Sequence, residues 1–114
     1  MPDNTNNSAQ AFQELVRVLE EALLAEAHSV GLEYEGRDLI VYHRFGNTGL
    51  GAARIPTQLQ QAVIGEIVKL AGLSRKPRGK MQVTLLGADY EASVKEYDSF
   101  GESAFTITLK ERQR

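Results

Sequence analysis

The residues best suited to bind a ligand form a cationic run in the second half of the chain. Arg75, Lys76, Arg78 and Lys80 fall within six residues, around Pro77. Cationic groups at this density can hold a phosphate group, a nucleotide or an acidic surface of a partner protein. A loop that is merely solvated explains the same charges, and the sequence leaves both interpretations open. No aromatic residue lies in the run to stack on a base, which argues against single-stranded nucleic acid.

The same run does not have the pattern of a phosphate-binding loop from a nucleotide hydrolase. Such a loop needs a glycine-rich turn followed by Lys and Ser or Thr at the start of a helix. Gly79 and Lys80 are followed instead by Met81 and a strand-like pattern. We therefore expect no ATP hydrolysis, no cofactor and no enzymatic activity.

Other groups that could carry chemistry have no partners at the required spacing. His28 and His43 share no metal-ligand spacing with each other or with a carboxylate, so no metal site is predicted. Ser29, Ser99 and Ser103 lie in no Gly-x-Ser-x-Gly context, which leaves nucleophilic catalysis without support. The absence of cysteine excludes disulfides and zinc–thiolate sites. No catalytic residue is predicted.

Length and charge are typical of one globular domain. The 114 residues carry a formal net charge of −2, which argues against a general nucleic-acid binder. No apolar run approaches the roughly 20 residues that span a bilayer, so membrane insertion is not expected. The first eight residues lack the basic and apolar segments of a secretory signal. We expect a cytoplasmic protein, and a homo-oligomer is compatible with the sequence.

The pattern of residues 79–109 predicts the core of the fold. Apolar and polar residues alternate there with period two, which predicts three consecutive antiparallel strands with one face in water. Ala92 and Ile107 fall on the face expected to be buried. The expected hairpins pair 81–86 with 89–95 and 90–97 with 103–110, with turns over 86–89 and 96–102.

The chain before this sheet is expected to add two helices and three strands. Apolar residues at helical spacing predict a helix over about 8–29, capped by Asn7 or Ser8 and ended by Gly31. The elements that follow are strands over 32–35, 39–45 and 50–55, a helix that starts after Pro56 with Thr57 as its cap and ends at Gly72, and a basic loop over 74–80.

The predicted fold class is therefore α+β, in the order α-β-β-β-α-β-β-β. Two helices are expected to pack on one face of a mainly antiparallel sheet, which gives two layers. The domain should span 8–110, between a disordered lead-in over 1–7 and a charged tail over 111–114.

Short segments along the chain match the motifs of a known domain. Residues 27–34 have the spacing of Ala-Ser-Asp-Ile-His-x-Glu-Pro, and Arg44 matches the arginine of a strand that ends in Arg-x-Asp-Gly. Residues 75–80 match Arg-x-Pro-Gln-Asp-Gly-Arg with one residue fewer, and a closing Gly-Glu recurs at Gly101 and Glu102. From about Ala22 to Lys110, the chain thus resembles the accessory domain that precedes the motor in type II secretion and type IV pilus assembly ATPases.

This resemblance implies a domain separated from its motor. In that family the accessory domain supplies arginines toward nucleotide held by the motor domain. Here Ala92 stands at the position of the strand arginine, Lys80 replaces the arginine after the glycine, and the motor's phosphate loop is absent. The resemblance therefore implies a stand-alone copy of the domain rather than an ATPase.

Two function hypotheses follow, with an enzyme as the least supported third. The first is an interaction and regulatory module that docks on a secretion or pilus assembly ATPase, or on a neighbouring component. The alternative is a small domain that binds phosphate or nucleotide through the loop 75–80. The candidate residues for a partner or a phosphate are Arg44, Arg75, Lys76, Arg78, Lys80, Gly101 and Glu102.

Overall fold

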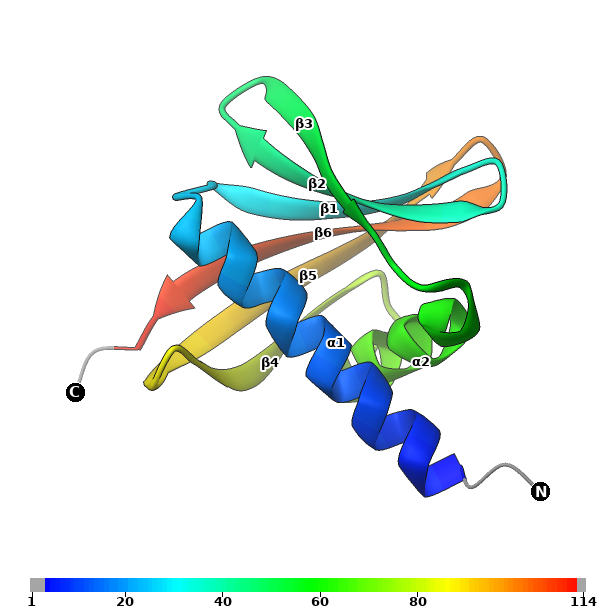
Figure 1. Ribbon diagram of the computed structural model, residues 1–114, viewed down its shortest axis with the longest axis horizontal. Helices are drawn as coiled ribbons and strands as arrows, with labels where there is room; N and C mark the ends of the chain where they lie inside the picture. The colour runs from blue at the N-terminus through cyan, green and yellow to red at the C-terminus, as the bar shows by residue number, and fades with distance from the viewer. Residues whose placement is uncertain (1–3, 113–114) are drawn as a thin grey trace.

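The computed structural model describes residues 4–112, with side chains from residue 7 onward, and has two helices on one face of a six-stranded sheet (Figure 1). This confirms the predicted α+β class and element order. The elements are α1 (Asn4–Leu24), β1 (Ser29–Glu35), β2 (Asp38–Phe45), β3 (Thr48–Arg54), a 3-10 turn (Thr57–Leu59), α2 (Gln60–Ala71), β4 (Arg78–Leu85), β5 (Ala88–Ser99) and β6 (Glu102–Glu111).

The sheet consists of two three-stranded meanders joined edge to edge. Its strand order is β3-β2-β1-β6-β5-β4, and every neighbouring pair is antiparallel. Both predicted hairpins, β4–β5 and β5–β6, are confirmed. The junction between the meanders is the pairing of β1 with β6, in which Val30 lies opposite Ile107 and Leu32 opposite Phe105.

The hydrophobic core lies between the helices and the sheet. The buried side of α1 repeats at helical spacing, and α2 adds a shorter buried stripe. Ala92 and Ile107 are both fully buried, as predicted. Among the described residues, no helix is long and apolar enough to cross a bilayer. The largest fully buried side chains are Phe105, Leu15, Leu19, Leu32, Leu39, Ile55, Ile67, Leu85 and Ile107.

The predicted bounds of the first helix were wrong at both ends. The helix begins at Asn4, so residues 4–7 belong to it, and residues 1–3 of the expected lead-in lie outside the described residues. It ends at Leu24 because Glu26 adopts a left-handed φ of 59°. The Ala27 N–H then donates to the Ala22 carbonyl at 3.0 Å, the closing bond of a Schellman motif. Because a glutamate stands where glycine is usual, the sequence does not indicate this helix end. Gly31, the predicted stop, lies within β1.

The second helix ends as predicted but begins differently. Gly72 has a left-handed φ of 67°, and the Leu73 N–H donates to the Val68 carbonyl at 2.9 Å. The chain passes through the 3-10 turn before α2 starts at Gln60, and no side chain caps either element, so Thr57 is not a helix cap.

The expected basic loop is shorter than predicted because β4 begins at Arg78. Gly79 lies opposite the buried Val94 and points to the helix side of the sheet. A Cβ on Gly79 would lie 1.8 Å from the carbonyl oxygen of Ala71, the last residue of α2. Only glycine therefore lets the end of α2 rest against the start of β4.

The turn expected over 96–102 is also shorter, because β5 continues to Ser99. Phe100 and Gly101 alone connect the strands, with φ of 53° and 86°. Two positive φ values are typical of the tight hairpin turns that match strand twist, although Phe is an unusual residue there. At the far end, β6 runs to Glu111 and so includes the start of the expected tail.

We expect Ile107→Ala to lower the free energy of unfolding by about 2–5 kcal/mol, because it leaves a cavity at the junction of the two meanders. Thr108→Ala, at an exposed neighbouring position of the same strand, should change it by less than about 0.5 kcal/mol. Urea denaturation measures both values, and equal effects would mean that the two faces of β6 are reversed.

We expect Gly79→Ala to destabilise the fold by about 3 kcal/mol, since the new methyl group meets backbone that cannot rotate away. The matched control is Gly65→Ala in α2, where nothing lies within 4 Å of a built Cβ. That change should stabilise the protein by about 0.5–1 kcal/mol, because alanine favours helix. Thermal or urea unfolding of both variants tests the contact, and a Gly79→Ala variant as stable as the wild type contradicts it.

Candidate functional site

The outer face of the sheet lies opposite the two helices (Figure 1), and the strand register places a row of mainly polar residues across it. On each strand these positions alternate with the core positions. In register order, the row contains Tyr42, Gly31, Thr106, Lys95 and Arg78. Cationic and hydroxyl groups from strands far apart in the sequence thus share one surface.

At one end of this row the outer face forms a shallow groove of about 380 Å³, which we call the outer groove. It spans the last three strands, β4, β5 and β6. Its lining combines three cationic side chains with three hydroxyl groups. The lining residues are Arg78, Lys80, Ser93, Val94, Lys95, Thr106 and Thr108.

The positive charge of the outer groove is only partly compensated. Lys80 lies 3.5 Å from a carboxylate oxygen of Glu91, in a largely exposed ion pair. Arg78 lies directly opposite Lys95 in the register of β4 and β5. Neither of these two forms an ion pair within 4.0 Å among the described residues. Two like charges side by side favour an anion between them.

Arg44 extends this polar surface from β2 toward β5. Its Nη2 donates to Oε2 of Glu33 and to the hydroxyl of Tyr97, both at 3.3 Å. Ser99 Oγ donates to the other carboxylate oxygen of Glu33 at 3.2 Å. The guanidinium lies directly over Gly31, since a Cβ there would be 2.5 Å from Nη2. Arg44 Nε is buried and has no hydrogen-bond partner among the described residues.

The tyrosines of the outer face remain protonated at neutral pH. A hydrogen bond to Glu35 raises the pKa of Tyr42 to about 12. Burial, followed by the nearby Glu33 carboxylate, raises the pKa of Tyr97. Both phenols therefore keep a proton to donate, and the Tyr97 oxygen also accepts the hydrogen bond from Arg44.

Of the seven predicted residues, the structure places two in the outer groove and a third, Arg44, on the same face of the sheet, whereas the other four do not line the groove. Arg78 and Lys80 line the outer groove, and Arg44 reaches across Gly31, which lies next to Thr106 of the groove. Gly101 and Glu102 lie at the β5–β6 turn and do not line the groove.

Arg75 and Lys76 lie beside a different pocket. It has a volume of about 400 Å³ and lies where the loop after α2 runs along β5. Glu96 and Asp98 also line it, and they occupy β5 positions on the helix side of the sheet. Carboxylates in the same pocket offset the positive charge, so this surface is poorly suited to an anion.

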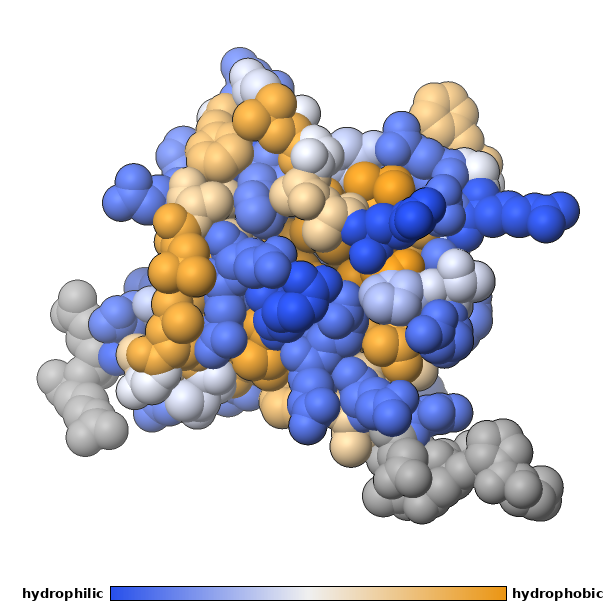
Figure 2. Space-filling view, viewed as in Figure 1, coloured by the Kyte–Doolittle hydropathy of each residue, from blue (hydrophilic) through white to orange (hydrophobic). Residues whose placement is uncertain are grey.

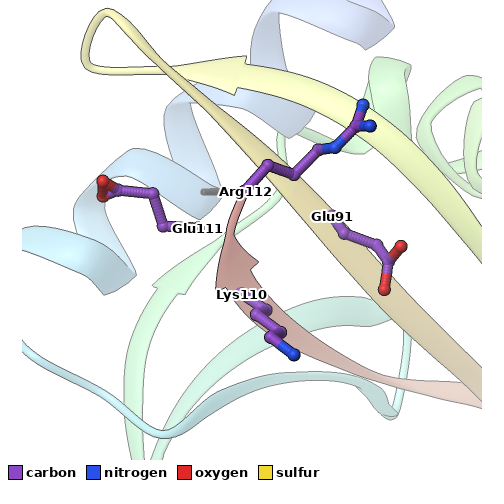
Figure 3. Close-up of a pocket in the computed structure, with 4 residues that line it drawn as sticks. All are labelled: Glu91, Lys110, Glu111 and Arg112. Carbon is purple, nitrogen blue, oxygen red and sulfur yellow. The ribbon is translucent and has the colours of Figure 1, made fainter. Parts of the chain in front are cut away.

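A third pocket, of about 340 Å³, lies at the end of β6 (Figure 3). Glu91 and Lys110 face each other across β5 and β6, and Glu111 points to the other side of the strand. Arg112 donates to the side-chain oxygen of Gln82 at 3.2 Å. The two carboxylates and two cations of this pocket balance each other, so it also gives no strong preference for an anion.

The sequence interpretation missed Lys95, which completes the cationic end of the row. Alternation along β5 already placed Lys95 on the wet face, but nothing local to it indicates Arg78 as its neighbour. Thr106 and Thr108 were likewise expected to face solvent, without a role. Their position beside Arg78 depends on the register of three strands.

The chemistry available in the outer groove is recognition of an anion. Guanidinium, ammonium and hydroxyl groups donate hydrogen bonds to carboxylate or phosphate oxygens. No carboxylate or histidine lines the groove, so it lacks a group suited to general acid–base work near neutral pH. Within residues 4–112, no three His, Asp or Glu side chains gather so that they could hold a metal ion.

Comparison with family models and with curated proteins found no match to this chain. The resemblance to the accessory domain of secretion and pilus ATPases therefore stays a prediction from short motifs. The candidate site is therefore inferred from its geometry and charge alone.

We expect the effect of Gly31→Ala to depend on Arg44. In the wild type the new methyl group displaces the guanidinium, at a cost of about 1 kcal/mol in the free energy of unfolding. In an Arg44→Ala background the same change should stabilise by about 0.4–1 kcal/mol, because alanine restricts the unfolded chain. A double-mutant cycle from urea denaturation measures the difference, and an identical effect in both backgrounds contradicts this placement of Arg44.

Proposed function

We propose that this protein is a non-catalytic interaction module that docks an acidic segment of a partner protein in the outer groove. The observation that carries the proposal is the facing pair Arg78 and Lys95, which have no carboxylate partner among residues 7–112 and lie on a sheet face that no helix covers. An acidic segment would supply the missing negative charge, and its carboxylates would accept hydrogen bonds from Ser93 and Thr108 as well.

A protein segment suits the outer groove better than a nucleotide does. The groove is shallow and extends over three strands, and none of its lining residues is aromatic, so it has no surface for base stacking. The chain's net charge of −2 also disfavours a long nucleic-acid polyanion. A small phosphate ligand held by Arg78, Lys80 and Lys95 is the alternative function, supported by the same side chains.

The resemblance suggests one class of partner for this module. It points to a secretion or pilus assembly ATPase, or a neighbouring component of such an assembly, and the cytoplasmic location expected from the sequence belongs to the same hypothesis. Docking in the outer groove does not depend on that resemblance, because it needs only a partner with exposed carboxylates.

The experiment is a titration with a fluorescent synthetic peptide rich in Asp and Glu, followed by anisotropy. We expect Arg78→Ala with Lys95→Ala to weaken binding about five- to thirtyfold, from two exposed charge contacts of roughly 0.5–1 kcal/mol each. Wild-type binding should also weaken with added salt, since the Debye length is about 10 Å at 0.1 M.

The matched control is Arg75→Ala with Lys76→Ala, which removes the same charge from the pocket beside β5. Its dissociation constant for the peptide should stay within about twofold of the wild-type value, because only the overall charge of the protein has changed. Equal losses in the two double variants would mean that net charge, and not the groove, determines binding. Strong competition by inorganic phosphate would favour the phosphate alternative, and ATP turnover by the purified chain would overturn the non-catalytic assignment.

A further inference from the structure

The free edge of β3 is unusually bare for the edge of a sheet. Every residue of the strand except Ala53 is exposed, and neither helix covers it (Figure 1). Arg54 is its only charged residue, and it lies 3.6 Å from Asp38 of the neighbouring strand. The strand contains no lysine and no proline, which proteins commonly use to block pairing at an edge.

The opposite edge, β4, is protected in the usual way. Its outward positions carry Arg78, Lys80, Gln82 and Thr84, and its inward side is covered by the helices. A second β4 placed against it would bring the cationic residues of two copies together. The two edges of this sheet therefore differ sharply in their capacity to accept another strand.

Hydrophobic side chains accompany the β3 edge on the helix side. Leu50 lies opposite His43, a core-side position, yet it is 56% exposed, and Leu24 at the end of α1 is 71% exposed. Figure 2 shows hydrophobic residues gathered along that side of the molecule, from β3 toward the end of α1. The edge thus combines unpaired backbone groups with uncovered apolar surface.

We propose that β3 pairs with β3 of a second copy of this chain, antiparallel and centred on Leu50. In this register the two Leu50 side chains lie opposite each other on the helix side, and Gly49 faces Gly51 on the outer face. Small residues let the two backbones approach without obstruction. A single bulge near Val41 and Tyr42 interrupts β3 only beyond Gly51, so Thr48–Gly51 remains regular.

Charge does not oppose a second copy at this edge. Within the regular part, Thr48–Gly51, neither copy has a charged side chain, so no like charges meet across the pairing. The cationic outer grooves lie toward the far edges of the joined sheet, with β3, β2 and β1 between each groove and the junction. A two-fold axis also limits the assembly to two chains. The pairing uses the β3 edge of each copy, and the cationic residues of β4 disfavour pairing at the other edge.

The expected dimer is small and weak. Seven residues of strand extend about 24 Å, which is short for an interface that holds two proteins together permanently. We therefore expect the 12.6 kDa chain to be monomeric when dilute and to approach twice that mass at concentrations on the order of 100 μM.

The experiment is sedimentation equilibrium of the full chain over that range, with one variant at the edge and one matched control. Leu50→Lys places two ammonium groups opposite each other at the centre of the pairing, so the dissociation constant should rise at least about tenfold. The control, Leu86→Lys, changes a leucine of similar exposure, 53% against 56%, at the β4–β5 turn, and it should leave the dissociation constant unchanged.

Amide hydrogen exchange of the wild type provides a readout that needs no variant. Residues 48–54 should gain protection as concentration rises, while the exposed edge of β4 should not. A wild-type chain that stays monomeric throughout the range overturns the proposal. A dimer whose dissociation constant is the same in Leu50→Lys overturns it as well. None of these measurements involves an anionic ligand, so their outcome is independent of binding in the outer groove.

Discussion

The approach of α2 to β4 at Gly79 is the contact on which the candidate site depends. The Ala71 carbonyl occupies the space that any side chain at Gly79 would need, so this residue must face the helices. Because side chains alternate along a strand, its neighbours Arg78 and Lys80 must then point to the outer face. A packing requirement in the core thus decides where two cations of the molecule are displayed.

The second structural requirement is the pairing of β1 with β6. All other neighbouring strands are connected by short turns, whereas these two come from opposite ends of the chain. Their register places Gly31 next to Thr106 and so brings Arg44 within 3.3 Å of Tyr97. The outer face is continuous because this one long-range pairing joins the two meanders.

The two faces of the sheet consequently have different roles. The helix face buries Phe105, Ile107 and their neighbours and supplies the stability of the fold. The outer face contributes little to the core and is free to carry polar groups. The loop before β4 crosses the edge between the faces, which is why Arg75 and Lys76 lie with carboxylates on one side while Arg78 and Lys80 lie on the other.

Much of the fold could be predicted because its signals are local. Alternation within 79–109 identified the strands of the second meander, their hairpins and the burial of Ala92 and Ile107, and Gly72 marked the end of α2. Each of these depends on the backbone preferences or solvent exposure of residues close together in the chain. The end of α1 escaped prediction because Glu26 adopts a conformation that glycine normally signals.

The composition of the site was decided by the tertiary structure. The sequence by itself identified Arg78 and Lys80 as candidates, but it grouped them with Arg75 and Lys76, which are their neighbours only along the chain. The groove requires Lys95 beside Arg78, and Arg44 reaches Tyr97 only across two intervening strands. A strand shows in its own sequence which residues share a face, whereas the identity of the residue across from each is a property of register. In the β4–β5 hairpin this register depends on the length of the turn between Leu85 and Ala88, which the sequence pattern left longer than it is. Between β1 and β6 the register follows from long-range packing, which no local pattern encodes.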